Sequence, residues 1–382
     1  MHLTILTNMW AFCSAIIVAF TCWGLSVSSA VAAPKPNVVF FMADDMGIGD
    51  TSAYLDLDPA GVGTINVAMN TPNLDQLARD GMVFTDAHTP ATMCSATRYG
   101  VLTGRHSYRT FLKARGWLRH DLDQPMIEPQ RSTVGTLMQD AGYRTAAIGK
   151  WHIGMSSVDQ NGHITSNFGS IDYTAPFVDA PTDHGFDYYF GIRANAVYDV
   201  HIENNRWVDM DRQLITDKNH RGSPGFWNQK KLDERHLNSA LDFIDDHLQN
   251  HENQPFFMYY APLSNHTPYD PPDDLNGEPI AGEGMLRDMD GNLTRPSSSP
   301  ITLNLRSDHV YQNDRALGQL INKLQDPDGN GDTSDSVLED TMIVFTSDNG
   351  SDKLGESNIG MRGRNCLLYT SDAADEGLGV DL

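Results

Sequence analysis

Cysteine is scarce in this chain, whose 382 residues contain four. Cys13 and Cys22 lie in an apolar amino-terminal stretch and Cys366 lies near the carboxyl end, so Cys94 is the one cysteine of the central part. A disulfide between two central cysteines is therefore excluded. An exported domain without such bonds depends on its apolar core and on bound metal for stability.

Positive charge is also sparse. The chain has 27 Lys and Arg against 50 Asp and Glu, which gives a formal net charge of -23. Nucleic-acid-binding surfaces are basic, because contacts to phosphate supply much of the affinity. We therefore expect no nucleic-acid partner.

One long apolar run occurs, at residues 9–33. Its centre is Ile16-Ile17-Val18-Ala19-Phe20, and Ala30-Val31-Ala32 fits the small-residue cleavage pattern of a secretory leader. We expect a signal peptide at residues 1–32, a secreted or periplasmic protein and no stable membrane partner. Because no Lys or Arg precedes the run, an uncleaved membrane anchor is the alternative.

The sequence changes character at its carboxyl end. Residues 366–382 resemble a translated sequencing adapter, and we interpret them as a non-native tail, with a polar tail of the protein itself as the alternative. The remaining residues 33–365 are enough for one large α/β domain with a sizeable core.

Apolar runs of strand length alternate with helical patterns. The expected strands cover residues 36–42, 143–149, 255–261 and 341–347. The expected helices cover residues 72–80, 134–141, 237–248 and 310–324. This order predicts a mostly parallel sheet with helices on both faces. Residues 156–229 show no clear periodicity and are interpreted as long loops over the mouth of a site.

Each expected strand is followed by polar residues. They are Asp44 and Asp45, Lys150 and His152, Asn265 and His266, and Asp348 and Asn349. Ligands of open α/β sheets bind at the carboxyl ends of the strands. The four strand ends therefore predict one functional site at that edge.

Oxygen ligands from two strand ends form a candidate metal site. Asp44, Asp45, Asp348 and Asn349 offer oxygens that suit Ca²⁺ or Mg²⁺, whereas zinc prefers His and Cys. Taken singly, Asp-Asp also fits a helix cap and Asp-Asn-Gly fits a turn. A structural role for each pair is therefore the alternative.

Cys94 begins a segment of distinctive pattern. A small polar run is followed by apolar residues and then Gly104, which predicts a loop that enters a short helix. On that helix Arg98 shares the face of Cys94, near an amino-terminal end that favours anions. A lone cysteine at a helix start is by itself more often a small buried apolar residue.

The residues around Cys94 resemble the signature of the type I sulfatases, which is Cys-x-Pro-x-Arg followed by Leu-Thr-Gly-Arg. The chain matches it at Cys94, Arg98 and residues 102–105, and Ala96 stands where the family usually has Pro. The segment Gly149-Lys150-Trp151-His152 is also similar to the family. The resemblance implies that a formylglycine-generating or anaerobic sulfatase-maturating enzyme oxidises Cys94 to formylglycine, whose hydrate is the nucleophile.

The same resemblance implies roles for the residues at the strand ends. Ca²⁺, with Mg²⁺ as the alternative, would be held by Asp44, Asp45, Asp348, Asn349 and the modified Cys94. Arg98 and Lys150 would hold the hydroxyls of the nucleophile and the sulfate. His152 would accept a proton from the hydrate, and His266 would contact the sulfate and help to protonate the leaving oxygen. Without the resemblance, His266 would be interpreted as a structural hydrogen-bonding residue.

We therefore expect a sulfuric ester hydrolase of alkaline-phosphatase-like fold that cleaves O-sulfate esters of a sulfated polysaccharide or an aryl sulfate. The alternatives are a phosphomonoesterase or phosphodiesterase of the same superfamily, or an inactive glycan-binding fragment. Family members carry Arg-Gly-x-Lys where this chain has Arg362-Gly363-Arg364-Asn365. We expect Lys at position 365 in the natural gene, a truncated catalytic domain at residues 33–365 and a missing carboxyl-terminal subdomain.

Overall fold

The computed structural model describes residues 35–55, 67–113, 115–118, 124–195, 201–208, 229–267, 269–296 and 301–350. The expected signal peptide, the expected tail and position 365 lie outside these ranges. In the described part, none of the helices has both the length and the apolar character that crossing a lipid bilayer requires.

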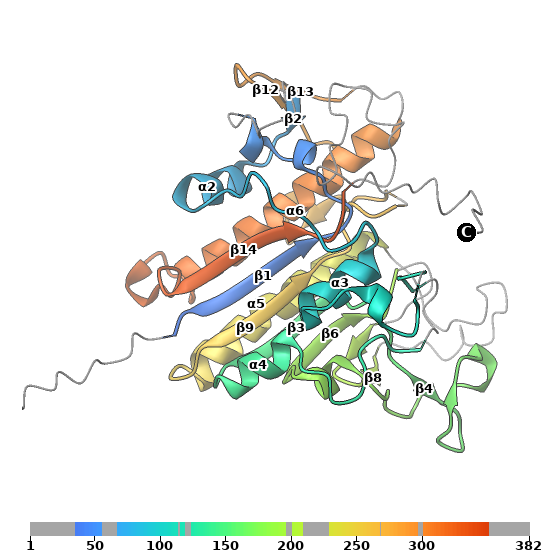
Figure 1. Ribbon diagram of the computed structural model, residues 1–382. Helices are drawn as coiled ribbons and strands as arrows, with labels where there is room; N and C mark the ends of the chain where they lie inside the picture. Colours follow the sequence, from blue (N-terminus) through green and yellow to red (C-terminus); the bar gives the residue numbers. More distant parts are fainter. Residues whose placement is uncertain are drawn as a thin grey trace, which may run out of the picture. The chain divides into compact units, whose positions relative to one another are not determined.

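A seven-stranded sheet forms the centre of the described residues from Pro36 onward (Figure 1). Its strand order is β14, β1, β9, β3, β6, β7, β8, and the first five strands run parallel. The strands are β1 (Asn37–Ala43), β3 (Arg144–Lys150), β6 (Tyr188–Ile192), β7 (Ile202–Glu203), β8 (Arg206–Trp207), β9 (Phe256–Ala261) and β14 (Thr341–Ser347). The four expected strands and the mostly parallel sheet are confirmed.

The interpretation of residues 156–229 as long loops was wrong for residues 188–192, 202–203 and 206–207, which form strands of the main sheet. Tyr188–Ile192 forms β6, which pairs in parallel with β3, and β7 and β8 extend the sheet in antiparallel order. β6 has only five residues, and the described residues between β3 and β6 contain no α-helix. Its strand character depends on pairing with β3, a tertiary contact that local periodicity does not report.

Helices cover both faces of the sheet, as predicted. In Figure 1, α5 and α6 lie behind the strands and α3 and α4 lie in front. The helices are α2 (Pro72–Asp80), α3 (Cys94–Thr103), α4 (Val134–Asp140), α5 (Leu232–Asn250) and α6 (Ile301–Gln325). Along β9, Phe256, Met258 and Tyr260 pack into the core with α5 and α6, whereas Phe257 and Tyr259 pack into the core with α3. Alternate strand residues thus build two apolar layers.

Several short strands pair with one another apart from the main sheet. The antiparallel pairs are β4 (Ser157–Val158) with β5 (Ile164–Thr165), β10 (Asp274–Leu275) with β11 (Glu278–Pro279), and β12 (Leu286–Asp288) with both β2 (Val67–Met69) and β13 (Leu293–Thr294). They lie outside the main sheet and leave the carboxyl ends of its parallel strands as the edge where polar residues gather.

Candidate active site

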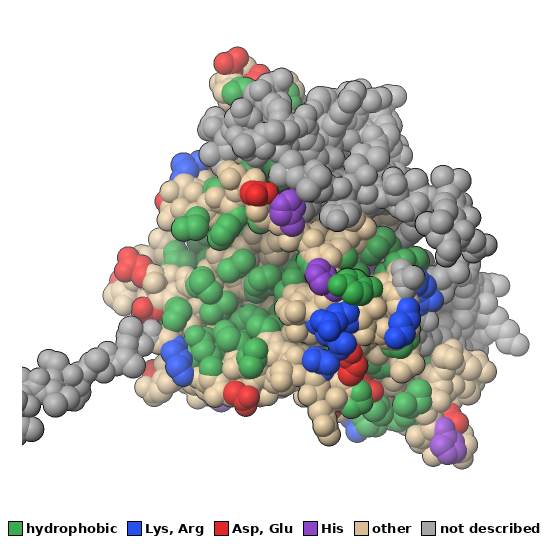
Figure 2. Space-filling model, viewed as in Figure 1, with side chains coloured by type: hydrophobic (Ala, Val, Ile, Leu, Met, Phe, Trp, Pro, Cys, Tyr) green, Lys and Arg blue, Asp and Glu red, His purple; other side chains and the backbone are tan. Residues whose placement is uncertain are grey.

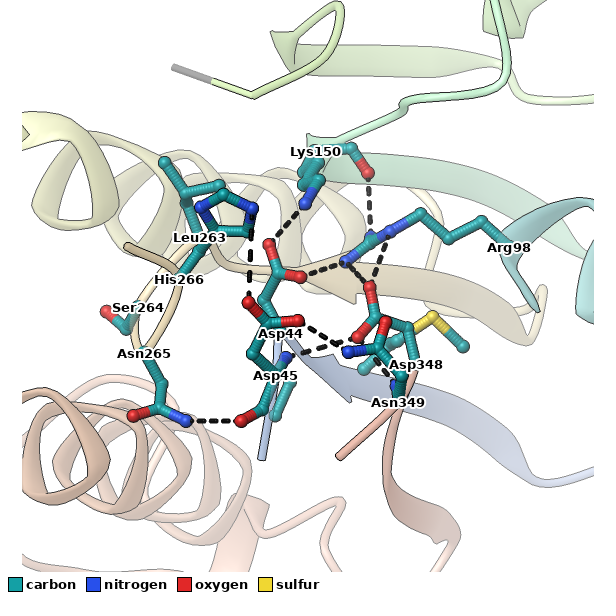
Figure 3. Close-up of polar contacts among 12 residues, drawn as sticks. Asp44, Asp45, Arg98, Lys150, Leu263, Ser264, Asn265, His266, Asp348 and Asn349 are labelled. Carbon is teal, nitrogen blue, oxygen red and sulfur yellow. Dashed lines mark hydrogen bonds and ion pairs between the residues drawn. The ribbon is translucent and has the colours of Figure 1, made fainter. Parts of the chain in front are cut away.

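The carboxyl ends of four parallel strands bring the expected residues together (Figure 3). Asp44 and Asp45 follow β1, Asp348 and Asn349 follow β14, and His266 follows β9. Lys150 is the last residue of β3, and His152 comes two residues later. The helix α3 contributes Cys94 and Arg98. Residues more than 300 positions apart therefore share one site because parallel strands end at the same edge of the sheet.

Four side chains form a buried cluster that could hold a metal. One potential ligand atom from each of Asp44, Asp45, Cys94 and Asp348 lies within 4.8 Å of those of the other three. Asn349 joins this cluster through a hydrogen bond of 2.5 Å from its Nδ2 atom to Asp45 Oδ1. Because three of the four groups are carboxylates, the cluster suits a hard cation such as Ca²⁺ or Mg²⁺.

The polar atoms and charges of the cluster fit a cation. Asp44 Oδ1 and Asn349 Oδ1 are buried and accept no hydrogen bond from the described residues. Burial, together with repulsion from Asp44, raises the pKa of Asp348 to about 6. Three carboxylates beside the cations Arg98 and Lys150 give a formal charge of -3 + 2 = -1, which a dication converts to +1. A bound dication would relieve the carboxylate repulsion and make the site attractive to an anion.

Two fully buried cations lie against the carboxylates. Arg98 donates from Nη2 and Nε to Asp348 Oδ2, at 2.7 and 3.1 Å, and from Nη1 to the carbonyl oxygen of Lys150 at 3.0 Å. Lys150 Nζ lies 2.5 Å from Asp44 Oδ2. Burial lowers the pKa of Lys150, but the anionic groups around it, of which Asp44 has the largest effect, together outweigh burial and raise the pKa, so the ammonium stays charged. Two buried cations therefore lie at this site although the chain as a whole is acidic.

Cys94 is the first residue of α3. The sequence offered two interpretations of this residue, a small buried apolar side chain and the source of a nucleophile, and each agrees with part of its surroundings. The side chain is 8% exposed, as expected of a small buried apolar residue, yet its Sγ atom lies in the carboxylate cluster. Burial raises the pKa of the Cys94 thiol well above its usual range, and the nearby Asp348, Asp44 and Asp45 add to this effect. An unmodified thiol at this position is therefore a poor nucleophile, since the thiolate is the reactive form.

The two histidines differ in environment. Burial, and after it the charges of Lys150 and Arg98, lowers the pKa of His152 well below its usual range, so this imidazole is neutral and can accept a proton. His266 is partly buried and donates from Nδ1 to the carbonyl oxygen of Thr267 at 2.6 Å. Its Nε2 atom lies 3.9 Å from Asp45 Oδ2, at the edge of the cluster. Each histidine is thus in a position to move a proton beside the cluster.

A buried network that the sequence did not indicate holds the segment before His266. Asp233 of α5 accepts hydrogen bonds from the backbone N–H of Leu263 at 2.8 Å and from the Ser264 hydroxyl at 2.5 Å. His309 Nδ1 of α6 accepts from the backbone N–H of Asn265 at 3.0 Å. Asn265 in turn donates from Nδ2 to the carbonyl oxygen of Asp45 at 2.7 Å.

These contacts join helices far apart in the chain, and no local motif marks Asp233 or His309. One signal was present: both are polar residues that lie on the faces their helices bury. Buried polar groups need partners, and here the partner is the backbone of the active-site segment. Together, the clustered oxygens, two buried cations and two histidines can bind a hard cation and an anionic ester.

Sequence comparison identifies the family. The sequence model of the family described as Sulfatase matches residues 36–374, and this chain belongs to that family. It is 27% identical over 357 residues to N-acetylgalactosamine-6-O-sulfatase of Bacteroides thetaiotaomicron, with 83% of this chain and 59% of the relative covered. It is 27% identical over 369 residues to arylsulfatase G of Rattus norvegicus, with 89% and 57% covered. The chain thus spans less than two thirds of the length of these curated relatives.

Solved structures share the fold. The chain aligns with a Bacteroides thetaiotaomicron protein from a study of glycosaminoglycan metabolism at a TM-score of 0.60 and 23% identity, covering 83% of this chain and 63% of that chain. It aligns with the PsFucS1 sulfatase of Pseudoalteromonas sp. at a TM-score of 0.53 and 23% identity, covering 83% and 56%. The expected α/β fold is therefore the fold of known sulfatase structures.

Proposed function

We propose that this protein hydrolyses O-sulfate esters to an alcohol and sulfate, with residue 94 as the site of the nucleophile. The observation that carries the proposal is the position of Cys94. This residue is the first of α3, and its Sγ atom lies in the buried carboxylate cluster, against which two buried cations lie. Membership of the sulfatase family supports the reaction class. Among the described residues the cluster contains no histidine, which argues against the His-rich two-zinc site expected of a phosphatase.

Cys94 would act after oxidation to formylglycine. Its thiol is buried with a raised pKa, and attack by the thiol itself is therefore disfavoured. The hydrate of the aldehyde would supply a hydroxyl group in the same place, at the start of α3 and beside the cations. The maturing partner would be a formylglycine-generating enzyme or an anaerobic sulfatase-maturating enzyme.

Asp44, Asp45, Asp348 and Asn349 would hold Ca²⁺, or Mg²⁺, together with the modified residue 94. When bound, this ion would act as a Lewis acid that polarises a sulfate oxygen. Arg98 and Lys150 stay charged although they are buried, and their charges would orient the anion and offset the charge that develops on its oxygens. These charges act strongly because the site is buried and the local dielectric is low.

Proton transfer would be divided between two histidines. His266 lies at the edge of the cluster, is partly exposed and donates from Nδ1 to Thr267, so its Nε2 atom would give a proton to the leaving alkoxide. His152 is neutral because burial lowers its pKa, and it would take a proton from the hydrate of residue 94 when the sulfate is released. The different environments suit an acid role and a base role.

The preferred substrate class is a sulfated polysaccharide, with aryl sulfates as assay compounds. One relative is named an N-acetylgalactosamine-6-O-sulfatase, and others are named arylsulfatases, which supports both. The expected signal peptide supports a secreted or periplasmic location. An exported enzyme of this kind would meet extracellular glycans.

The test is turnover of an aryl sulfate and of the matching aryl phosphate by protein produced together with a maturing enzyme. We expect sulfate ester hydrolysis that Cys94→Ala abolishes and that Cys94→Ser reduces strongly, since serine does not form the hydrate. Preferential hydrolysis of the phosphate would support the phosphatase alternative. No hydrolysis of either ester by matured protein would support an inactive glycan-binding protein.

A further inference from the structure

The part of the chain that leads away from the active site differs in charge from the rest. No Asp or Glu occurs between Asp86 and Asp121, although the chain has 50 acidic residues and a formal net charge of -23. Arg105, Arg109, Lys113 and Arg115 all fall in this interval, on residues 105–118, called here the basic loop. In Figure 2, Lys and Arg side chains gather on the face shown, over the region where Figure 1 draws α3.

The basic loop begins at the carboxyl end of α3 and ends beside the amino-terminal end of that helix, where Cys94 lies. It leaves α3 after Gly104, whose φ of 64° ends the helix, and it returns until the backbone N–H of Leu118 donates to Ser95 Oγ at 2.9 Å. Ser95 is the neighbour of Cys94 in the sequence. The end of the loop is therefore fixed next to the residue proposed as the nucleophile.

The side chains of the basic loop are of the kinds that bind sulfated sugars. Arg109, Lys113 and Arg115 are exposed. Tyr108 and Phe111 are 59% and 45% exposed, and the partly exposed Trp117 has the Arg115 guanidinium 5.9 Å from its ring centroid. Aromatic rings offer flat faces for sugar rings, and guanidinium and ammonium groups bind sulfate and carboxylate oxygens.

The charge of the loop is only partly neutralised. Glu128 pairs with Arg105 and with Arg131. Among the described residues, no carboxylate pairs with Arg109 or Lys113. An acidic protein that keeps exposed cations on a loop tied to Ser95 has a local attraction for anions there.

A pocket adjoins the basic loop at Phe111. Phe111 forms part of its wall, and the other walls include residues 124–129 and Met155–Ser157, which begin three residues after His152. The volume is about 540 Å³. Small-molecule sites range from roughly 300 to 1,000 Å³, so this pocket has room for a sugar unit next to the one that reacts.

We propose that the basic loop and the adjoining pocket bind the sugar units that flank the reacting sulfate ester, and that the substrate is a polymer with several sulfate groups. The inference rests on the proposed sulfatase function and adds the location of the binding surface. Exposed cations attract the anionic groups along the chain, and the aromatic side chains stack on its sugar rings. An aryl sulfate reaches only the buried cations and would not use the loop.

Binding is tested apart from catalysis in the Cys94→Ala variant of this chain, which needs no maturation. The probes are chondroitin sulfate, hyaluronan, which carries carboxylates but no sulfate, and a DNA duplex. The test variant adds Arg109→Gln, Lys113→Gln and Arg115→Gln. The matched control instead adds Lys35→Gln, Arg79→Gln and Lys231→Gln, which remove the same charge from exposed positions elsewhere on the chain.

Each exposed cation contact contributes a few-fold to affinity, so the triple substitution in the loop weakens binding of chondroitin sulfate roughly tenfold and flattens its salt dependence. The control substitutions leave this binding within about twofold. Equal losses in both variants, no loss in the test variant, or binding of hyaluronan or DNA as tight as that of chondroitin sulfate would overturn the inference.

The same loop substitutions in matured Cys94 protein leave kcat/KM for an aryl sulfate unchanged and lower kcat/KM for a sulfated polysaccharide. An equal fall for both substrates contradicts the inference. If the unsubstituted, matured protein hydrolyses no aryl sulfate, the proposed function fails, and the binding experiment with Cys94→Ala still decides the role of the basic loop.

Discussion

The Asp233→Asn substitution tests whether a buried carboxylate on α5 positions the active site. Asp233 accepts hydrogen bonds from Leu263, Ser264 and His236 and is 7% exposed. Asparagine has nearly the same volume but only one acceptor oxygen, so its amide N–H₂ must face at least one of these donors. Hydrogen bonds to a buried charged group contribute about 1.5–3 kcal/mol each, and an unsatisfied buried donor costs about 1–3 kcal/mol. We expect the free energy of unfolding to fall by about 2–4 kcal/mol.

The catalytic effect of Asp233→Asn follows from the same contacts. The segment Leu263–Asn265 loses an anchor, so His266 shifts while Arg98 and Lys150 keep their places. We expect kcat for an aryl sulfate to fall at least about tenfold with little change in KM, since small displacements of a catalytic group are costly. Urea unfolding and steady-state kinetics measure the two effects.

The matched control for this experiment is Asp246→Asn. Asp246 lies on the same helix, half exposed, and pairs with Arg144 at the start of β3. We expect changes below about 1 kcal/mol and unaltered kinetics there. An Asp233→Asn protein with wild-type stability and kcat, or one whose KM rises while kcat is retained, would refute the positioning role.

Three further predictions concern the metal, the backbone and buried histidine. Treatment with a Ca²⁺ chelator lowers aryl sulfatase activity and the midpoint of thermal unfolding, and added Ca²⁺ restores both; unchanged values in the two assays would exclude a bound Ca²⁺. Gly149→Ala destabilises the protein by more than about 3 kcal/mol in urea, because Gly149 has a φ of 106° and a Cβ atom would lie 2.0 Å from the carbonyl oxygen of Ala261. Gly162→Ala is the control, with a φ of 79° but open space around it, and an equal loss there would contradict the steric argument. Burial lowers the pKa of His309 from 6.5 to about 4, so its stabilising contribution is present above pH 6.5 and is lost as the pH falls toward 4. At about 1.4 kcal/mol per pKa unit the contribution is of order 3 kcal/mol, and His309→Gln should flatten this part of the stability–pH curve; an unaltered slope would show that His309 is not the titrating group.

The sequence predicted which residues lie together at the candidate site because parallel strands end at the same edge of a sheet. Asp44, Lys150, His266 and Asp348 each lie at or just after the end of a strand that local apolarity marks clearly. Once the strands are parallel neighbours, their carboxyl ends meet without any information on register or packing. Cys94 and Arg98 needed only the helical repeat to share a face.

Other parts of the molecule depend on contacts that the sequence does not display. β6 was interpreted as loop because Tyr188–Ile192 is short and becomes a strand by pairing with β3. Asp233 and His309 are single polar residues on buried helix faces, and their partners in the segment before His266 are distant in sequence. For Cys94 the sequence left open a buried apolar role and a role in chemistry, and its place in the carboxylate cluster supports the second.

The central claim is that residue 94 acts as a formylglycine and not as a thiol. Peptide mass spectrometry of protein produced with a maturing enzyme, combined with aryl sulfate turnover of the same sample, tests this claim most directly. We predict that residue 94 has lost sulfur and two hydrogens and gained oxygen, and that activity rises in proportion to the converted fraction. Full activity in a sample whose residue 94 is entirely an intact cysteine thiol would contradict the account.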